Sequence, residues 1–193
     1  MAVSEDLKRL RDLTGVSIMQ CKKALEEAGG DIEKAKLMLR KASAAIATKK
    51  ADRTLGAGVA AAYTHAGGSV VGAVVLGCET DFVSKNEDFQ KLAYDIAMHV
   101  AAMNPSFRIR EDITEADLTT MREVFEKEVQ NVPEAARGKA LEGKIDSVLK
   151  ERVLLEQPFV KDSTTTIRGL LDSAVQKFGE KVEVVRFERL SVK

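Results

Sequence analysis

Histidine and cysteine are the side chains that most often bind metals or act as nucleophiles, and this chain has two of each. Neither histidine, His65 nor His99, lies within metal-ligand spacing of the other or of a cysteine, Cys21 or Cys78. We therefore expect structural or surface roles for both histidines, with His99 off the apolar face of its helix. For both cysteines we expect reduced, partly buried thiols. The sequence predicts no metal site and no bound cofactor.

One glycine-rich stretch, GAGVAA at residues 56–61, partly fits the fingerprint of a dinucleotide-binding loop. That fingerprint requires a strand before it and a helix after it, whereas here the order of the patterns is reversed. Phosphate-loop motifs that end in Gly-Lys-Ser or Gly-Lys-Thr do not occur, and neither does a nucleophile elbow. Most acidic residues fall on helix faces that we expect to be solvated. We therefore predict a binding protein, not an enzyme.

The composition narrows the class of partner. Of the 193 residues, 45% are hydrophobic and 31% charged, which is typical of a globular protein. Thirty basic residues balance thirty acidic ones, so the basic excess of a nucleic-acid binder is missing and we expect no direct nucleic-acid partner. The longest apolar run, residues 70–78, is too short to span a bilayer. Because the first residues also have no apolar signal core, we expect a cytoplasmic protein without a membrane partner.

Two groups of residues are distinguished by position. Ile18 and Met19 begin a predicted helix, where Met19 lies off the apolar stripe and Ile18 borders it. They either pack at the edge of the core, which is the more common arrangement, or form a docking surface for a partner.

The second group is the segment Thr80, Asp81, Phe82 and Val83, between a predicted strand and a predicted helix. Its aromatic side chain, Phe82, is surrounded in sequence by polar residues. It either folds back as a lid on the core, which is the more common arrangement for phenylalanine, or projects into a partner. The residues alone leave both alternatives open.

The elements that position Ile18 and Met19 are three short helices. Ser4, Ser17 and Asp31 are their predicted caps, and Gln20 completes a capping box with Ser17. Their predicted buried stripes are Leu7, Leu10 and Leu13; Cys21, Ala24, Leu25 and Ala28; and Ile32, Ala35 and Leu39. An alanine-rich helical linker is expected at residues 41–53. Residues 1–54 are therefore predicted to form a three-helix module with its linker.

The elements that position Phe82 belong to an expected core at residues 55–193. Strands are predicted at 59–65, 70–77 and 181–190. In the last of these the alternation shifts between Val184 and Val185, which indicates either a bulge or burial on both faces. Ser84 or Asn86 caps a helix with an apolar face made of Phe89, Leu92, Ala93, Ile96, Val100 and Met103. Two helices after Thr114 and Pro133, an extended segment at 157–160 and a helix that ends at Gly179 follow. The predicted fold class is α+β: a three-stranded antiparallel sheet with helices covering one side.

Several blocks of this sequence resemble the elongation factor Ts family, in the right order and over nearly the whole chain. They are LRDLTG at 10–15, CKKALEEA at 21–28, GDIEKA at 30–35, CETDFV at 78–83, DIAMHVAA at 95–102 and QPFVK at 157–161. The resemblance implies a ubiquitin-associated-like N-terminal module and a guanine nucleotide exchange factor for elongation factor Tu. The turn made of Thr80, Asp81, Phe82 and Val83 would enter that GTPase near its magnesium and phosphate site. Phe82 would be the wedge, and Asp81 would help to fix the turn and contact the partner. Ile18 and Met19 match the family's apolar pair that presses on a partner helix.

The chain departs from the family in two places. Residues 17–20 are SIMQ where the family usually has Gly-Met-Met-Asp, so the apolar character is kept but the fine contacts differ. Larger members carry a duplicated core half and a helical hairpin, whereas this chain has room for one sheet unit, from which we expect a homodimer. The alternative functions are an adaptor that binds proteins through residues 1–54 and an RNA-binding accessory that uses Lys49, Lys50 and Arg53. These three residues are more simply a solvated helix end.

Overall fold

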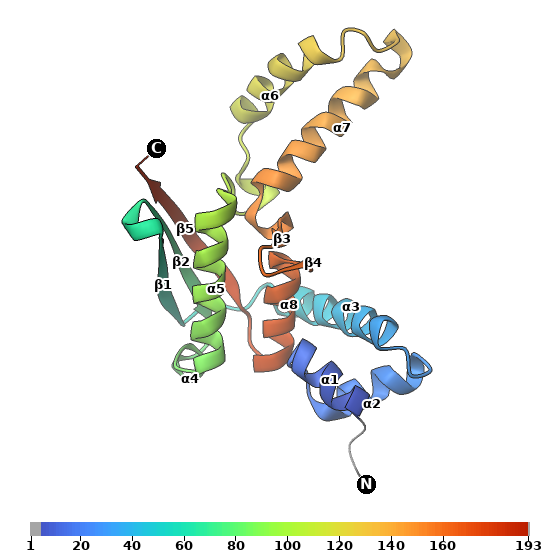
Figure 1. Ribbon diagram of the computed structural model, residues 1–193, viewed down its shortest axis with the longest axis vertical. Coiled ribbons are helices and arrows are strands. Elements are labelled where there is room, and N and C mark those ends of the chain that lie inside the picture. Colours follow the sequence, from blue (N-terminus) through green and yellow to red (C-terminus); the bar gives the residue numbers. More distant parts are fainter. Residues whose placement is uncertain (1–4, 193) are drawn as a thin grey trace.

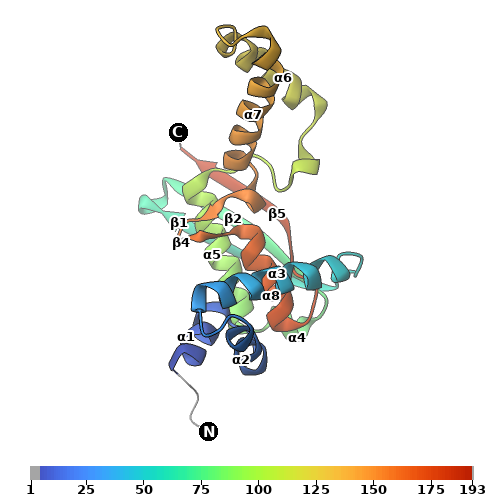
Figure 2. The same cartoon turned by 90° about the vertical axis from the view of Figure 1, so that its right-hand side faces the viewer.

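The computed structural model describes residues 5–192, which form an elongated molecule with three parts. Three helices lie at one end, a mixed helix-and-sheet body lies in the centre, and a pair of helices projects at the other end (Figures 1 and 2). The α+β class predicted from the sequence is confirmed.

The N-terminal part consists of α1 (Glu5–Thr14), α2 (Ile18–Glu27) and the start of α3 (Ile32–Lys50). Two predicted caps are confirmed: the Ser17 hydroxyl accepts from the N–H of Gln20, and Asp31 accepts from the N–H of Lys34. The cap predicted at Ser4 lies outside the described residues. The side chain of Gln20 bonds the Ser17 hydroxyl at 3.0 Å instead of the cap's backbone. These helices bury a small core made of Leu7, Leu10, Val16, Cys21, Ala24, Leu25, Ala28, Ala35 and Leu39. Leu13, predicted to point inward, is exposed.

Helix α3 is longer than predicted, since the expected linker is its second half. No glycine or proline interrupts residues 32–50, so nothing in the backbone chemistry ends the helix earlier. The second half packs along α8 (Ile167–Phe178), with Ile46 and Ala47 against the main core. Helix α3 therefore connects the N-terminal helices with the body as one continuous helix.

The sheet contains β1 (Ala57–His65), β2 (Val70–Cys78) and β5 (Glu183–Ser191) in the order β1-β2-β5. Both pairs are antiparallel, as predicted, and the 3₁₀ turn Ala66–Gly68 joins the first two strands. Val75 pairs with Arg186 and Leu76 pairs with Val184, so Val185 is an extra residue in β5. Of the two alternatives for this strand, the bulge is the one found, and it restores the alternation that keeps Val184 and Phe187 on the core face.

Helix α5 (Glu87–Met103) covers one face of this sheet, and α4 (Asp81–Ser84) is a single turn that leads into it (Figure 1). Asn86, one of the two predicted caps, bonds the N–H of Asp88. The predicted apolar face is buried at Phe89, Ala93, Ile96 and Val100, partly buried at Leu92 and exposed at Met103. Asn104, with a φ of 48°, ends the helix in the left-handed conformation.

The remaining two long helices do not cover the sheet. Helices α6 (Glu115–Glu128) and α7 (Glu134–Arg152) pack on each other and project from the body as a hairpin (Figure 1). Thr114 caps α6 as predicted, with Asp117 completing a capping box. The chain therefore has one sheet unit, as expected, and also the helical hairpin that we expected only in larger members of the family.

Two short 3₁₀ segments connect the hairpin to the body: Arg110–Asp112 precedes α6, and Leu154–Glu156 follows α7. Strands β3 (Pro158–Phe159) and β4 (Asp162–Thr166) then form a small two-stranded sheet, of which only β3 was predicted. Helix α8 follows and ends at Gly179, whose φ of 71° suits glycine, so this predicted end is confirmed.

Candidate functional site

The single turn α4 presents Phe82 to solvent. The side chain of Phe82 is 82% exposed, whereas that of its neighbour Val83 is 4% exposed and lies in the main core. Adjacent residues of a helix point about 100° apart, so one residue of this turn can be buried while the next projects. Val83 is therefore the residue that covers the core at this turn. The alternative in which Phe82 folds back on the core is wrong.

The backbone before Phe82 is held by a carboxylate that the sequence did not identify. One oxygen of Glu180 accepts from the N–H groups of Glu79 and Thr80, each at 3.0 Å. Its other oxygen accepts from the Thr80 hydroxyl at 2.6 Å. Glu180 lies in the loop between α8 and β5, about one hundred residues from the turn, and no local signal in the sequence connects the two.

Asp81 is exposed and forms an ion pair with Lys85, one helical turn later, at 2.7 Å. The hydrogen bond from Lys85, with the charge of its ammonium, lowers the pKa of Asp81. The Ser84 hydroxyl donates to the carbonyl of Asp81 at 3.0 Å. These contacts are local, so Asp81 can support the turn but, being exposed, contributes little to overall stability.

A second exposed apolar surface lies at the start of α2. Met19 is 78% exposed, so it does not pack at the edge of the core. Ile18 is 39% exposed and borders a shallow cavity of about 270 Å³ lined also by Leu7, Lys8, Arg11 and Asp12. Ser17 caps the first turn of this helix, and both side chains are accessible to a partner.

The two apolar surfaces lie at the same end of the molecule. Both views place α2 and α4 at the end opposite to the projecting hairpin (Figures 1 and 2). Lys177 of α8 lies between the two surfaces. Its ammonium pairs at 2.7 Å with Asp88, which is at the start of α5, and a β-carbon on Gly15, which is in the loop before α2, would lie 3.5 Å from its Cδ. The hydrogen bond from Lys177 lowers the pKa of Asp88. A single partner could therefore contact both surfaces.

Comparison with known proteins identifies the family. Residues 33–193 match the family model described as Elongation factor TS. The chain is 46% identical over 185 residues to the elongation factor Ts of Desulforamulus reducens, covering 95% of this chain and 85% of that protein. It is 41% identical to that of Thermotoga petrophila and 44% identical to that of Herpetosiphon aurantiacus, over all of this chain and 97% and 98% of theirs. The chain belongs to the elongation factor Ts family.

Membership of the elongation factor Ts family gives the chain a role in translation elongation. The family was identified from the sequence blocks, and the full-length matches confirm that prediction. One of the matching blocks, residues 78–83, runs from the last residue of β2 into α4.

The cysteines and histidines do not belong to the two exposed apolar surfaces at Phe82 and at Met19. Cys21 and Cys78 are both free and buried. Burial, with the nearby charge of Glu180, raises the pKa of the Cys78 thiol, which donates to the carbonyl of Thr80 at 3.2 Å. Within residues 5–192 no three His, Cys, Asp or Glu side chains gather as a metal site would require. No helix among these residues is long and apolar enough to cross a membrane.

His99 is fully buried, so the prediction that it lies off the apolar face of α5 is wrong. Its Nε2 bonds the side-chain oxygen of Gln157 at 2.8 Å, and the N–H of Val160 donates to its Nδ1 at 3.2 Å. The role is structural, as expected. His65 is exposed and bonds the hydroxyl of Tyr63 at 3.0 Å.

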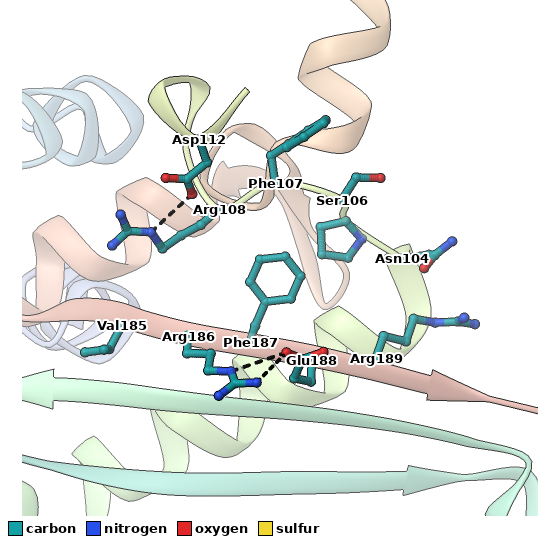
Figure 3. Close-up of a pocket in the computed structure, with 11 residues that line it drawn as sticks. Asn104, Ser106, Phe107, Arg108, Asp112, Val185, Arg186, Phe187, Glu188 and Arg189 are labelled. Carbon is teal, nitrogen blue, oxygen red and sulfur yellow. Dashed lines mark hydrogen bonds and ion pairs between the residues drawn. The ribbon is translucent and has the colours of Figure 1, made fainter. Parts of the chain in front are cut away.

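A groove of about 620 Å³, separate from the two apolar surfaces, lies between residues 104–112 and β5. Figure 3 shows Phe187 pointing from β5 into it. The groove is lined by three arginines, each with a partner inside the chain: Arg108 with Asp112 and Glu183, Arg186 with Glu188, and Arg189 with the carbonyl of Ala101. Because two of these three positive charges are paired with carboxylates, the groove has little excess positive charge with which to attract phosphates.

Proposed function

We propose that this chain is a guanine nucleotide exchange factor for elongation factor Tu, and that it is not an enzyme in the sense of making or breaking covalent bonds. The observation that carries the proposal is the exposure of Phe82 on a turn that is anchored on both sides, by Val83 in the core and by Glu180. In the proposed complex, Phe82 enters the GTPase near its magnesium and phosphate site, with Thr80, Asp81 and Val83 shaping the turn.

The physical basis is the differential binding of two ligands by one GTPase. Magnesium bridges the nucleotide phosphates and the protein, so a disturbance of its ligands weakens the binding of GDP. Burial of the Phe82 side chain on docking contributes about 1.5–3 kcal/mol towards that disturbance. The coupling is reciprocal, because whatever the factor subtracts from the affinity for GDP, GDP subtracts from the affinity for the factor.

Ile18 and Met19 supply the second contact in this proposal. A flexible methionine adapts its shape to a partner surface, which suits docking better than displacement. The module at 1–54 would then provide affinity, and the core at 55–193 would provide the wedge. The process would take place in the cytoplasm, where translation elongation occurs.

We also propose a homodimer that forms through the open face of the sheet. Helix α5 covers one face, while the large apolar side chains Val75, Val185 and Leu190 are exposed on the other. A second copy of this chain would bury them. Light scattering should give the mass of two chains at high concentration, and Val75→Glu should reduce it to one. A wild-type mass of one chain at all concentrations would exclude the dimer.

The experiment that tests the exchange function is the release of fluorescent GDP from purified bacterial elongation factor Tu. Wild-type protein should accelerate release, and Phe82→Ala should reduce that acceleration about ten- to a hundredfold, which corresponds to the burial energy of the ring. The matched control is Val124→Ala, which removes an exposed apolar side chain of α6 and should release GDP like the wild type. Circular dichroism should show all three proteins equally folded, since both side chains are exposed.

Two other outcomes would change the proposal. Wild-type acceleration that persists in Phe82→Ala would keep the exchange function and transfer the mechanism to Ile18 and Met19. No acceleration by the wild-type protein would exclude the exchange function and favour the adaptor that binds proteins through its N-terminal module.

A further inference from the structure

Two glutamates connect the turn before Phe82 with the loop before β5 in a reciprocal way. The carboxylate of Glu180 accepts from the N–H groups of Glu79 and Thr80, while the carboxylate of Glu79 accepts from the N–H of Lys181 at 2.6 Å. The ladder between β2 and β5 extends only to the pair Gly77 and Glu183. The two carboxylates therefore continue the connection between these segments beyond the point where strand pairing stops.

The loop that carries Glu180 is itself fixed from a third direction. Lys50, in the last turn of α3, donates to the carbonyl of Gly179 at 2.7 Å, and Lys181 donates to the carbonyl of Ala51 at 2.7 Å. Arg53 pairs with Glu79 at 3.1 Å. The hydrogen bond from the Lys181 backbone, with the charge of Arg53, lowers the pKa of Glu79 and keeps it an acceptor.

These contacts determine the backbone that carries the exposed ring. Thr80 is the residue before α4, and all of its polar contacts with Glu180 involve its N–H or its hydroxyl. Beyond Phe82, Val83 is buried in the main core. Without Glu180, the N–H and the hydroxyl of Thr80 would lose their partner and face water, and the turn would be attached only through Glu79 before it and Val83 beyond it.

We propose that Glu180 is a positioning residue for nucleotide exchange: it holds the turn at Thr80 so that Phe82 keeps one direction before the partner arrives. This inference rests on the proposed exchange function and adds to it a residue that does not touch the partner's nucleotide. Pre-organisation of a binding element lowers the ordering cost of the step in which it is used. Glu180 should therefore affect the rate of GDP release much more than the strength of docking.

The contribution of Glu180 to overall folding should be small, because both it and Thr80 are accessible to solvent. A merely stabilising residue would change the melting temperature and the activity together. A positioning residue should change activity with little change in the melting temperature. The two roles are therefore separable by experiment.

The test is a titration of the factor against elongation factor Tu loaded with fluorescent GDP, which separates the maximal release rate from the half-saturating concentration. Glu180→Ala should lower the maximal rate about fivefold, as expected for the loss of charge-assisted hydrogen bonds at a partly exposed site, and should leave half-saturation nearly unchanged. Glu180→Gln keeps an acceptor for the two N–H groups and should recover much of the rate. The matched control is Glu128→Ala, which removes a glutamate paired with Lys144 on the hairpin and should behave like the wild type.

Combination with Phe82→Ala tests whether Glu180 acts through the ring. In the Phe82→Ala background, Glu180→Ala should have no further effect on the maximal rate, since the two changes remove the same action. Thr80→Val, which loses only the hydroxyl donor, provides a second variant in case Glu180→Ala is poorly folded, and it should also lower the maximal rate.

The outcomes distinguish the two proposals. A wild-type protein that accelerates release together with a Glu180→Ala variant of equal maximal rate would overturn the positioning role and leave the exchange function intact. Additive effects of Glu180→Ala and Phe82→Ala would also overturn it. No acceleration by the wild-type protein would overturn the exchange function and, with it, this inference.

Discussion

Acidification from pH 7.5 to 5.5 should destabilise the protein through one buried histidine. His99 has no exposed surface, and its Nδ1 accepts a hydrogen bond from the N–H of Val160. The proton of the neutral ring therefore lies on Nε2, which donates to Gln157. Protonation would place a hydrogen on Nδ1 against the N–H of Val160 and a charge in an apolar site. Burial consequently lowers the pKa of His99, and the hydrogen bond with Gln157 offsets this only in part.

The sign and size follow from the difference between the folded and unfolded states. Unfolded histidine has a pKa of about 6.5, so above that pH both states are neutral and the full stability is present. Below it the unfolded chain binds a proton that the native state does not, and stability falls by at most about 1.4 kcal/mol per pH unit until the folded pKa is reached. Between pH 7.5 and 5.5 the expected loss is therefore up to about 1.4 kcal/mol.

Urea unfolding followed by circular dichroism at both pH values measures this loss. His99→Gln should be less stable than the wild type at pH 7.5 and should lack the histidine-dependent loss. His65→Gln, which changes the other histidine of the chain, should keep it. Burial raises the pKa of Asp172, which acts in the opposite direction but equally in all three proteins. Equal pH dependence in His99→Gln and wild type would refute the assigned role of His99.

Two glycines and an asparagine give further predictions, each measured by urea unfolding. Gly72→Ala should cost about 2–3 kcal/mol or more, since its β-carbon would clash with the carbonyl oxygen of Ala97 and would push α5 from the sheet. Gly143→Ala, in the middle of α7 with no atom within 4 Å of its β-carbon, should instead stabilise the protein by about 0.5–1 kcal/mol. Asn104→Ala should cost about 1 kcal/mol because of the positive φ, and Asn104→Gly should not; equal losses would contradict this explanation.

Local chemistry made much of this fold predictable. The caps at Ser17, Asp31 and Thr114 are satisfied within a few residues of sequence, and the alternation in β1 and β2 needs no distant partner. The two successive apolar residues Val184 and Val185 showed that the alternation shifts there, but not whether the cause was a bulge or burial on both faces. The direction of the α6–α7 hairpin was not predictable, because its half-buried apolar stripe would serve equally for packing on a sheet or on another helix.

The candidate site was predictable in position but not in orientation. The sequence places Phe82 and Val83 side by side in a turn, and either could be the buried one. Which of the two side chains is buried depends on the direction that the chain takes after β2, and this direction is set by tertiary packing. Glu180 was missed for the same reason, since its three hydrogen bonds reach across about one hundred residues. The burial of His99 was missed because a buried imidazole is acceptable only with partners, and these come from residues 157–160.

The two apolar surfaces differ in how firmly they are supported, and this difference suits the proposed division between docking and displacement. A side chain can displace a ligand in a partner only when its own support yields less than the partner's site does. Phe82 has such support from Val83 in the core and from Glu180, which is itself held through α3 and the loop before β5. Met19 is a flexible side chain at a helix tip and would adapt to the partner instead of deforming it. Since α3 joins both regions as one helix, docking at Met19 would also place the supported ring against its target.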